Sequence, residues 1–354
     1  MNDISPFLKQ LISLPGLSAN EGPVREVIAE KWRPLVDELS VSRLGSLHGL
    51  RRASRQGPVP GILIATHMDA IGLMVTGIHD GFLTVTQVGG IDPRILPGQI
   101  VTVHGRQELS GLAILWPDRL VKTTHKGKAP NLDRILIDIG LPENDVKDLV
   151  RVGDLVSFAS TPTDLAGSAL TGHTLDNRAS VAALTICLEE LRKVNLDWDL
   201  WAAATVQEEV SLAGAATSPA AVEPAMVVAV DVTFAKGPGA SDHRTFPLGK
   251  GPTIGVGSNI HPYMYKQFKT IAEENDIPYA IETMPRNSGT DAMYMQIVNS
   301  GIPCAVIGIP LRYMHTPVEE VVLSDIQRTG RLLAAFIKNL EPDTLDQLSR
   351  EMRP

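Results

Sequence analysis

Long apolar runs without any charged residue recur along this chain. The four clearest are GILIAT (61–66), AAATV (202–206), MVVAV (226–230) and CAVIGI (304–309). Uninterrupted apolar runs of this length are typical of strands that are buried on both faces of a parallel sheet. The pattern therefore predicts four buried strands, and we expect them to lie in one sheet.

Segments with a helical period separate these runs. Apolar residues recur at helical spacing in 181–191, and further helices are predicted over 263–274, 290–299 and 324–340. Strands that alternate with such helices predict an α/β fold in which a mixed sheet is flanked by helices. GVGS (255–258) contains neither a full dinucleotide fingerprint nor a Walker lysine, and it is predicted to be a turn.

The pattern of apolar residues changes between about residues 72 and 160, where strands and helices no longer alternate. Short runs of β-branched and apolar residues are broken there by Gly-Gly, Asp-Pro and Pro-Gly pairs. This pattern favours a small β-rich domain with tight turns. We therefore predict an inserted β-rich domain over 70–164, and an α/β domain made of 1–69 and 165–354.

Composition narrows the choice of partners. The 354 residues carry a formal net charge of −8, which argues against nucleic acid and anionic membrane surfaces as partners. No apolar stretch approaches the roughly 20 residues needed to cross a bilayer, and the amino terminus does not resemble a secretory signal. The two cysteines, Cys187 and Cys304, lie far apart in apolar surroundings, which suits reduced thiols. We expect a cytoplasmic protein that binds small molecules or peptides.

Residue types that bind metals or transfer protons stand at the ends of the predicted elements. They are His67, Asp69, Asp176, Glu208, Glu209, Asp231 and His315. Asp176 lies at a predicted helix start, and the others follow predicted strands. In open α/β sheets, the carboxyl ends of the strands border one crevice. We therefore expect these side chains to converge there.

These residue types indicate a hydrolytic metal site, because imidazole and carboxylate are ligands that suit zinc and similar divalent ions. A catalytic zinc ion takes about three protein ligands, so five ligands suit two ions, roughly 3.5 to 4 Å apart, that share a bridging carboxylate. One carboxylate must stay off the metals to transfer protons. Glu208 neighbours a proposed ligand and can point elsewhere, so it is predicted to be the general base.

Taken singly, several of these residues also have structural interpretations. His67 could be a hydrogen-bonded core histidine, Asp176 a helix cap and His315 a residue of a surface loop. Thr290 and Asp291 could cap the helix that follows them or contact the substrate, and both alternatives stay open. The metal interpretation is favoured because several strand ends carry the same residue types.

Six motifs resemble those of the M42 family of metallo-aminopeptidases, which includes the tetrahedral and the glutamyl aminopeptidases. They are HMDAIG (67–72), LDNR (175–178), TVQEEVSLAGA (205–215), VAVDVT (228–233), SGTDA (288–292) and RYMHTPVEE (312–320). They occur in the same order through nearly the whole chain. The resemblance implies a di-zinc exopeptidase-like fold with a β-rich domain inserted after the HMD motif.

The resemblance also implies a ligand set. Asp176 would bridge two divalent ions, which would be Zn²⁺ or, as the alternative, Co²⁺. His67 and Asp231 would complete the shell of one ion, and Glu209 and His315 that of the other.

An activity and an assembly are implied as well. The enzyme would remove N-terminal residues from peptides with Glu208 as the base, while Asp69 would orient a metal-bound histidine through its second ring nitrogen. The inserted domain would mediate a dimer that builds a dodecamer. Ala70 and Ser211 replace an acidic residue and a glycine that are common in the family, but neither departure removes a ligand.

Two other functions are compatible with parts of this pattern. Paired carboxylates also serve glycoside hydrolysis, so an enzyme of endoglucanase type is one alternative. Such an enzyme needs no metal pair. The other alternative is a non-catalytic member of the family that acts as an assembly module.

Overall fold

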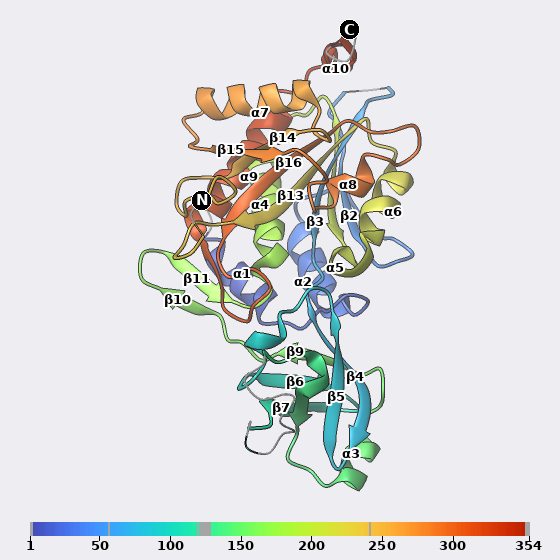
Figure 1. Ribbon diagram of the computed structural model, residues 1–354. Helices are drawn as coiled ribbons and strands as arrows, with labels where there is room; N and C mark the ends of the chain where they lie inside the picture. The colour runs from blue at the N-terminus through green and yellow to red at the C-terminus, as the bar shows by residue number, and fades with distance from the viewer. Residues whose placement is uncertain (1–2, 56, 118, 120–128, 241, 351–354) are drawn as a thin grey trace.

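The chain forms a large α/β region and a smaller β region attached at one end of it (Figure 1). The computed structural model describes residues 3–55, 57–117, 119, 129–240 and 242–350. Within these residues, no helix is long and apolar enough to cross a membrane.

A mixed sheet of eight strands forms the centre of the α/β region. In spatial order the strands are β1 (Glu38–Val41), β2 (Leu47–Arg51), β12 (Asp199–Thr205), β3 (Gly61–His67), β13 (Met226–Phe234), β16 (Cys304–Leu311), β14 (Thr253–Gly257) and β15 (Ala280–Met284). The four strands predicted from apolar runs are β12, β3, β13 and β16, which are adjacent and parallel. The predicted mixed α/β sheet is therefore confirmed.

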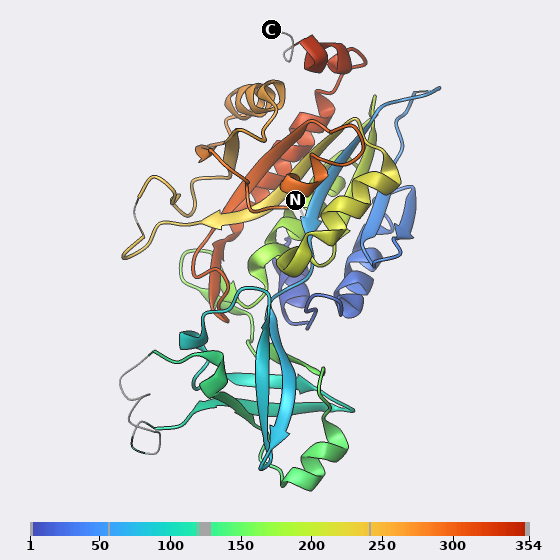
Figure 2. The same ribbon diagram turned by 45° about the vertical axis from the view of Figure 1, so that its right-hand side comes forward.

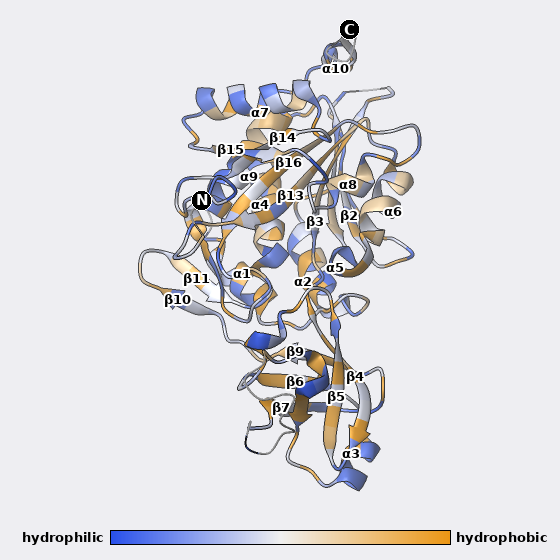
Figure 3. Ribbon diagram, viewed as in Figure 1, coloured by the Kyte–Doolittle hydropathy of each residue, from blue (hydrophilic) through white to orange (hydrophobic). Residues whose placement is uncertain are grey.

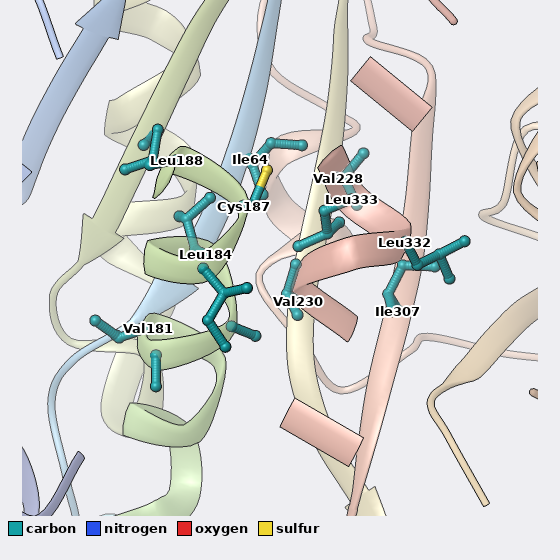
Figure 4. Packing of buried hydrophobic residues seen from close by; sticks show 14 of the residues in the cluster. Ile64, Val181, Leu184, Cys187, Leu188, Val228, Val230, Ile307, Leu332 and Leu333 are labelled. Carbon is teal, nitrogen blue, oxygen red and sulfur yellow. The ribbon is translucent and has the colours of Figure 1, made fainter. Parts of the chain in front are cut away.

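Helices cover both faces of this sheet because its central strands are apolar on both sides. Ile62 and Ile64 of β3 belong to one buried cluster, whereas Leu63 and Ala65 belong to another. The first cluster includes α1 (Ser5–Ile12), α2 (Gly22–Trp32), α4 (Leu175–Leu191), α7 (Pro262–Glu274) and α9 (Leu323–Lys338), and the second includes α6 (Ala213–Val222) and α8 (Ala292–Met295). Figure 4 shows the side chains of α4 and α9 packed against β3, β13 and β16.

The helix predicted over 290–299 is much shorter in the structure. Only α8 is helical there, and its Ala292 and Met295 are buried. Ile297 continues the apolar spacing but is 68% exposed. Ile297 therefore lies outside the core, and no helix continues there to bury it.

The turn predicted at GVGS (255–258) is wrong, because Gly255, Val256 and Gly257 belong to β14. A side chain on Gly257 would place its Cβ only 1.8 Å from the carbonyl oxygen of Met284 on β15. Glycine permits this close approach of two backbones.

The smaller β region is a closed six-stranded barrel that lies between β3 and α4 in the sequence. Its strands are β4 (Gly72–His79), β5 (Phe82–Val88), β8 (Ile135–Asp138), β7 (Glu108–Leu115), β6 (Ile100–His104) and β9 (Leu155–Phe158), and the helix α3 (Glu143–Leu149) packs beside them. Apolar residues are concentrated on the barrel strands and the central sheet (Figure 3). The barrel has its own core, separate from those of the sheet.

The remaining elements are short. A three-stranded sheet contains β10 (Thr163–Leu165), β11 (Ala169–Gly172) and β17 (Glu319–Val322), and the last helix is α10 (Thr344–Arg350). Single turns of 3₁₀ helix, η1 (Pro93–Ile95) and η4 (Leu132–Arg134), lie in the barrel region. β3 runs toward the barrel, so its carboxyl end lies where the two regions meet (Figure 2).

Candidate metal centre

Two histidines and four carboxylates converge at the carboxyl edge of the central strands. They come from β3 (His67), α4 (Asp176), the short helix α5 at 208–211 (Glu208 and Glu209), β13 (Asp231) and the loop after β16 (His315). Parallel pairing aligns the strand ends: Thr205 at the end of β12 pairs with His67. Residues up to 248 positions apart, from 67 to 315, thereby reach one place.

A first group of potential ligands is His67, Asp176 and Asp231. Nε2 of His67 lies 3.2 Å from Oδ1 of Asp176 and 3.6 Å from Oδ1 of Asp231. All three side chains are buried. One nitrogen and two carboxylate oxygens thus face a common point, as three ligands of a divalent cation would.

A second group shares Asp176 with the first and adds Glu209 and His315. Nε2 of His315 lies 3.3 Å from Oδ2 of Asp176 and 3.4 Å from Oε2 of Glu209. Asp176 therefore directs one carboxylate oxygen to each group. This is the arrangement in which one carboxylate can bridge two cations.

Glu208 lies beside both groups and forms a third group of potential ligands with His67 and Glu209. Its Oε2 is 3.8 Å from Nε2 of His67, and its side chain is 12% exposed. Burial, together with the negative charges of Asp231 and Asp291, raises the pKa of Glu208 to about 9, although His67 acts in the opposite direction. The carboxyl group therefore binds a proton readily.

The cluster contains more carboxylates than cationic side chains. Burial and the charge of Asp176 raise the pKa of Glu209 well above its usual value, and burial also raises the pKa of Asp231. Despite its burial, Asp176 has a lowered pKa because His315 and His67 donate hydrogen bonds to it. Concentrating buried carboxylates is unfavourable unless cations compensate them. The residues present therefore fit two divalent cations.

Asp69 supports the cluster mainly through backbone groups. Its Oδ1 accepts a hydrogen bond from the N–H of Glu208 (2.9 Å), and its Oδ2 accepts one from the N–H of Glu209 (3.2 Å) and one from Oγ of Ser18 (2.6 Å). Nδ1 of His67 lies 3.2 Å from the carbonyl oxygen of Asp69 and 3.6 Å from its Oδ1. The backbone oxygen is thus the nearer partner of the second ring nitrogen.

Thr290 and Asp291 lie beside the cluster but are nearly inaccessible, at 6% and 2% exposed. Oδ2 of Asp291 accepts a hydrogen bond from Oγ1 of Thr205 (2.6 Å), while Oγ1 of Thr290 lies 2.9 Å from Oγ of Ser288. Burial raises the pKa of Asp291 to about 7. Oδ1 of Asp291 is buried and has no hydrogen-bond partner among the described residues.

Two residues that the sequence analysis did not single out contact the cluster through the backbone. Glu319 accepts hydrogen bonds from the N–H groups of Asp176 and His315, each at 3.0 Å. The carbonyl oxygen of Gly90, in the barrel region, accepts a hydrogen bond from the ring of His315. Glu319 lies in the RYMHTPVEE motif, which was the available signal, whereas nothing in the sequence links the Gly-Gly pair at 89–90 to His315.

Comparison with known proteins gives a consistent result. Residues 45–332 match the family model described as M42 glutamyl aminopeptidase. A lysyl aminopeptidase from Pyrococcus furiosus is 33% identical over 342 residues, which cover 95% of this chain and 97% of that protein.

Solved structures give the same result. An aminopeptidase from the archaeon Desulfurococcus kamchatkensis superposes with a TM-score of 0.90 at 33% identity, covering 98% of each chain. The TET1 peptidase of Pyrococcus horikoshii, which can assemble into a tetrahedron or a large octahedral shell, superposes with a TM-score of 0.82 at 28% identity, covering 96% of this chain and 100% of that one.

Proposed function

The chain belongs to the M42 family of glutamyl aminopeptidases and is a metallo-aminopeptidase, and we propose that it removes N-terminal residues from peptides at the cluster described above. The observation that carries this proposal is the position of Asp176. Its Oδ1 and Oδ2 face His67 and His315, respectively, so one carboxylate connects the two groups of potential ligands.

The proposed ligand set follows from these two groups. His67, Asp176 and Asp231 would bind one divalent cation, and Asp176, Glu209 and His315 the other. Zn²⁺ suits imidazole and carboxylate ligands, and Co²⁺ is the second candidate. When bound, such a pair polarises a carbonyl group and lowers the pKa of a coordinated water molecule.

Glu208 is proposed as the general base. Glu208 also forms a third group with His67 and Glu209, but the two groups that share Asp176 each reach three ligands without it. Its Oε2 lies within 3.8 Å of His67, so it can reach the same space. Without cations its raised pKa would keep the carboxyl group protonated, so the base depends on bound cations, which would lower that pKa. Glu208 would accept a proton from the attacking water and donate it to the leaving amine.

Asp69, Thr290 and Asp291 have proposed supporting roles. Asp69 would orient His67 and also position the backbone of the Glu208–Glu209 pair. Oδ1 of Asp291, buried without a hydrogen-bond partner among the described residues, adds negative charge beside the cluster. We propose that this charge, with Thr290 beside it, favours the ammonium group of a peptide N-terminus.

A cavity of about 660 Å³ provides room for peptide side chains. It lies beyond the carboxyl ends of β13 and β16, and its lining includes Met314, which precedes His315. Phe234, Leu311 and Tyr313 form part of its wall, and Arg244 lies at it as well. We propose that the first residues of the peptide substrate occupy this cavity.

Replacing Glu208 with Gln tests the proposed mechanism. Because the amide of the new side chain cannot accept the proton, hydrolysis of aminoacyl chromogenic substrates should fall by about 10² to 10⁴-fold, while the chain keeps two metal ions as measured by mass spectrometry. Glu274→Gln, on the exposed surface of α7, is the matched control and should change neither quantity.

A parallel loss of activity and metal in Glu208→Gln would instead make Glu208 a ligand. Cleavage of cellulose oligomers that resists a chelator would favour the glycoside hydrolase, and a metal-free chain inert toward every aminoacyl substrate would favour an assembly module.

Self-association is proposed for the inserted domain, residues 70–164, with a dimer as the unit of a dodecamer. The proposal is supported by apolar side chains on the barrel surface: Ile100, Leu112, Trp116 and Val152 are 42–67% exposed. Size-exclusion chromatography with light scattering should therefore give the mass of an oligomer. A strict monomer would contradict the proposal.

A further inference from the structure

Glu319 is a buried carboxylate next to the metal centre that belongs to neither group of ligands. It lies at the start of β17, is 1% exposed, and directs both of its oxygens at backbone N–H groups. Oε2 accepts the hydrogen bond of Asp176, and Oε1 accepts that of His315. One side chain therefore connects the peptide groups of two proposed ligands that are 139 residues apart in the sequence.

The backbone of His315 needs such a contact. Its φ angle is +62°, in the left-handed region that residues other than glycine rarely adopt. His315 also lies in a loop, where no strand pairing restrains it. Backbone conformations of this kind persist only when the surrounding structure enforces them. The hydrogen bond from its N–H to Glu319 is part of that enforcement.

The buried surroundings of Glu319 contain one cationic side chain. Arg178 is fully buried, donates hydrogen bonds to the carbonyl groups of Leu11 and Met68, and interacts electrostatically with both Asp69 and Glu319. Burial and the charge of Asp176 raise the pKa of Glu319 well above its usual value, and the two N–H hydrogen bonds act in the opposite direction. The geometry alone requires an acceptor at both oxygens, whereas an amide in this position could accept with only its single oxygen.

Asp69 provides an internal precedent for this arrangement. Its two oxygens accept hydrogen bonds from the N–H groups of Glu208 and Glu209. In the same way, the two oxygens of Glu319 accept hydrogen bonds from the N–H groups of Asp176 and His315. Two buried carboxylates thus each determine the backbone position of two residues of the cluster.

We propose that Glu319 is a positioning residue for the second cation, because one carboxylate sets the spacing between the bridging ligand Asp176 and the terminal ligand His315. It contacts neither substrate nor cation. The inference rests on the proposed function, since it requires two cations. The first cation depends on it less, because Glu319 accepts a hydrogen bond from the backbone of only one of its proposed ligands, Asp176, but from two ligands of the second cation.

The test is titration of Co²⁺ into the full-length chain after chelator treatment, followed by calorimetry. In Glu319→Gln, the affinity for the second ion should fall about 10- to 100-fold, the usual cost of removing a partner that orients a ligand. The affinity for the first ion should change far less. Glu320→Gln is the matched control, because this neighbour faces Arg312 instead and should leave both affinities unchanged.

Glu319→Asp separates position from charge, and it also carries the test if Glu319→Gln does not fold. The shorter side chain keeps the carboxyl group but cannot reach both N–H groups, so the affinity for the second ion should fall in this variant as well. Unchanged affinity for both ions in either variant would overturn the proposal. An equal loss of affinity for both ions would also overturn it, because a merely structural role predicts that result. Fewer than two ions in the unsubstituted chain would refute the proposed function itself, and this inference with it.

Discussion

The two halves of the candidate metal centre share one residue, Asp176, but are built by different means. His67 and Asp231 lie on the adjacent strands β3 and β13, and both are buried. Glu209 and His315 lie outside the sheet, in the short helix α5 and in a loop, and the side chain of His315 is 35% exposed. The first half is therefore fixed by strand pairing, and the second half is not.

Side chains and the inserted domain replace strand pairing in the second half. Asp69 accepts a hydrogen bond from the N–H of Glu209, and Glu319 accepts one from the N–H of His315. The barrel region contributes directly, because the backbone of Gly90 hydrogen-bonds to His315. The first site is thus a property of the α/β sheet, whereas the second also depends on the barrel. We therefore expect substitutions to affect the two sites unequally.

The largest effect is expected where the halves meet. Asp176→Asn keeps the shape of the side chain but removes the charge and one acceptor, so both sites should lose their ions. Peptidase activity should fall on the order of a thousandfold or more, because the cations supply several kcal/mol of transition-state stabilisation. Metal analysis and aminoacyl substrate assays measure the two quantities.

Asp197→Asn, an exposed aspartate, is the control and should change nothing. If Asp176→Asn kept one ion at full affinity, Asp176 would serve only one site, and the two halves would not be joined by a shared ligand.

The same division explains what could be predicted from the sequence. The apolar runs identify β3, β12, β13 and β16, because a strand that is buried on both faces is apolar at nearly every position. Parallel strands end at one edge, so the polar residues after them were expected to converge, and the structure brings His67, Asp231 and the Glu208–Glu209 pair together.

Contacts that depend on loops left no such pattern. Glu319 and Asp176 are 143 residues apart, and no periodicity indicates that a carboxylate accepts a distant N–H group. The glycines of GVGS illustrate the same problem, because glycine marks both turns and close strand contacts, and only the position of Met284 distinguishes them. Sequence patterns report burial and local geometry, whereas the support of the second site consists of long-range polar contacts.

A smaller effect is expected from Gly90, and it tests the dependence on the barrel. A methyl group at this position would lie 3.1 Å from Nδ1 of His315, which is tighter than ordinary contact, so the ring must shift. In Gly90→Ala, the affinity for the second ion should fall about tenfold, which is the lower end of the range for removing a group that orients a ligand. The affinity for the first ion should stay unchanged. Calorimetric titration of the chelator-treated chain measures both affinities.

Gly22→Ala is the matched control, because its methyl group would meet only the flexible end of Arg25 at 3.8 Å. It should bind both ions as the unsubstituted chain does. Unchanged binding in Gly90→Ala would mean that the barrel does not restrain His315, and the second site would then depend on the α/β region alone. An equal loss of affinity for the first ion would mean that the two halves respond as one unit, because Asp176 and Glu209 both lie between His315 and His67.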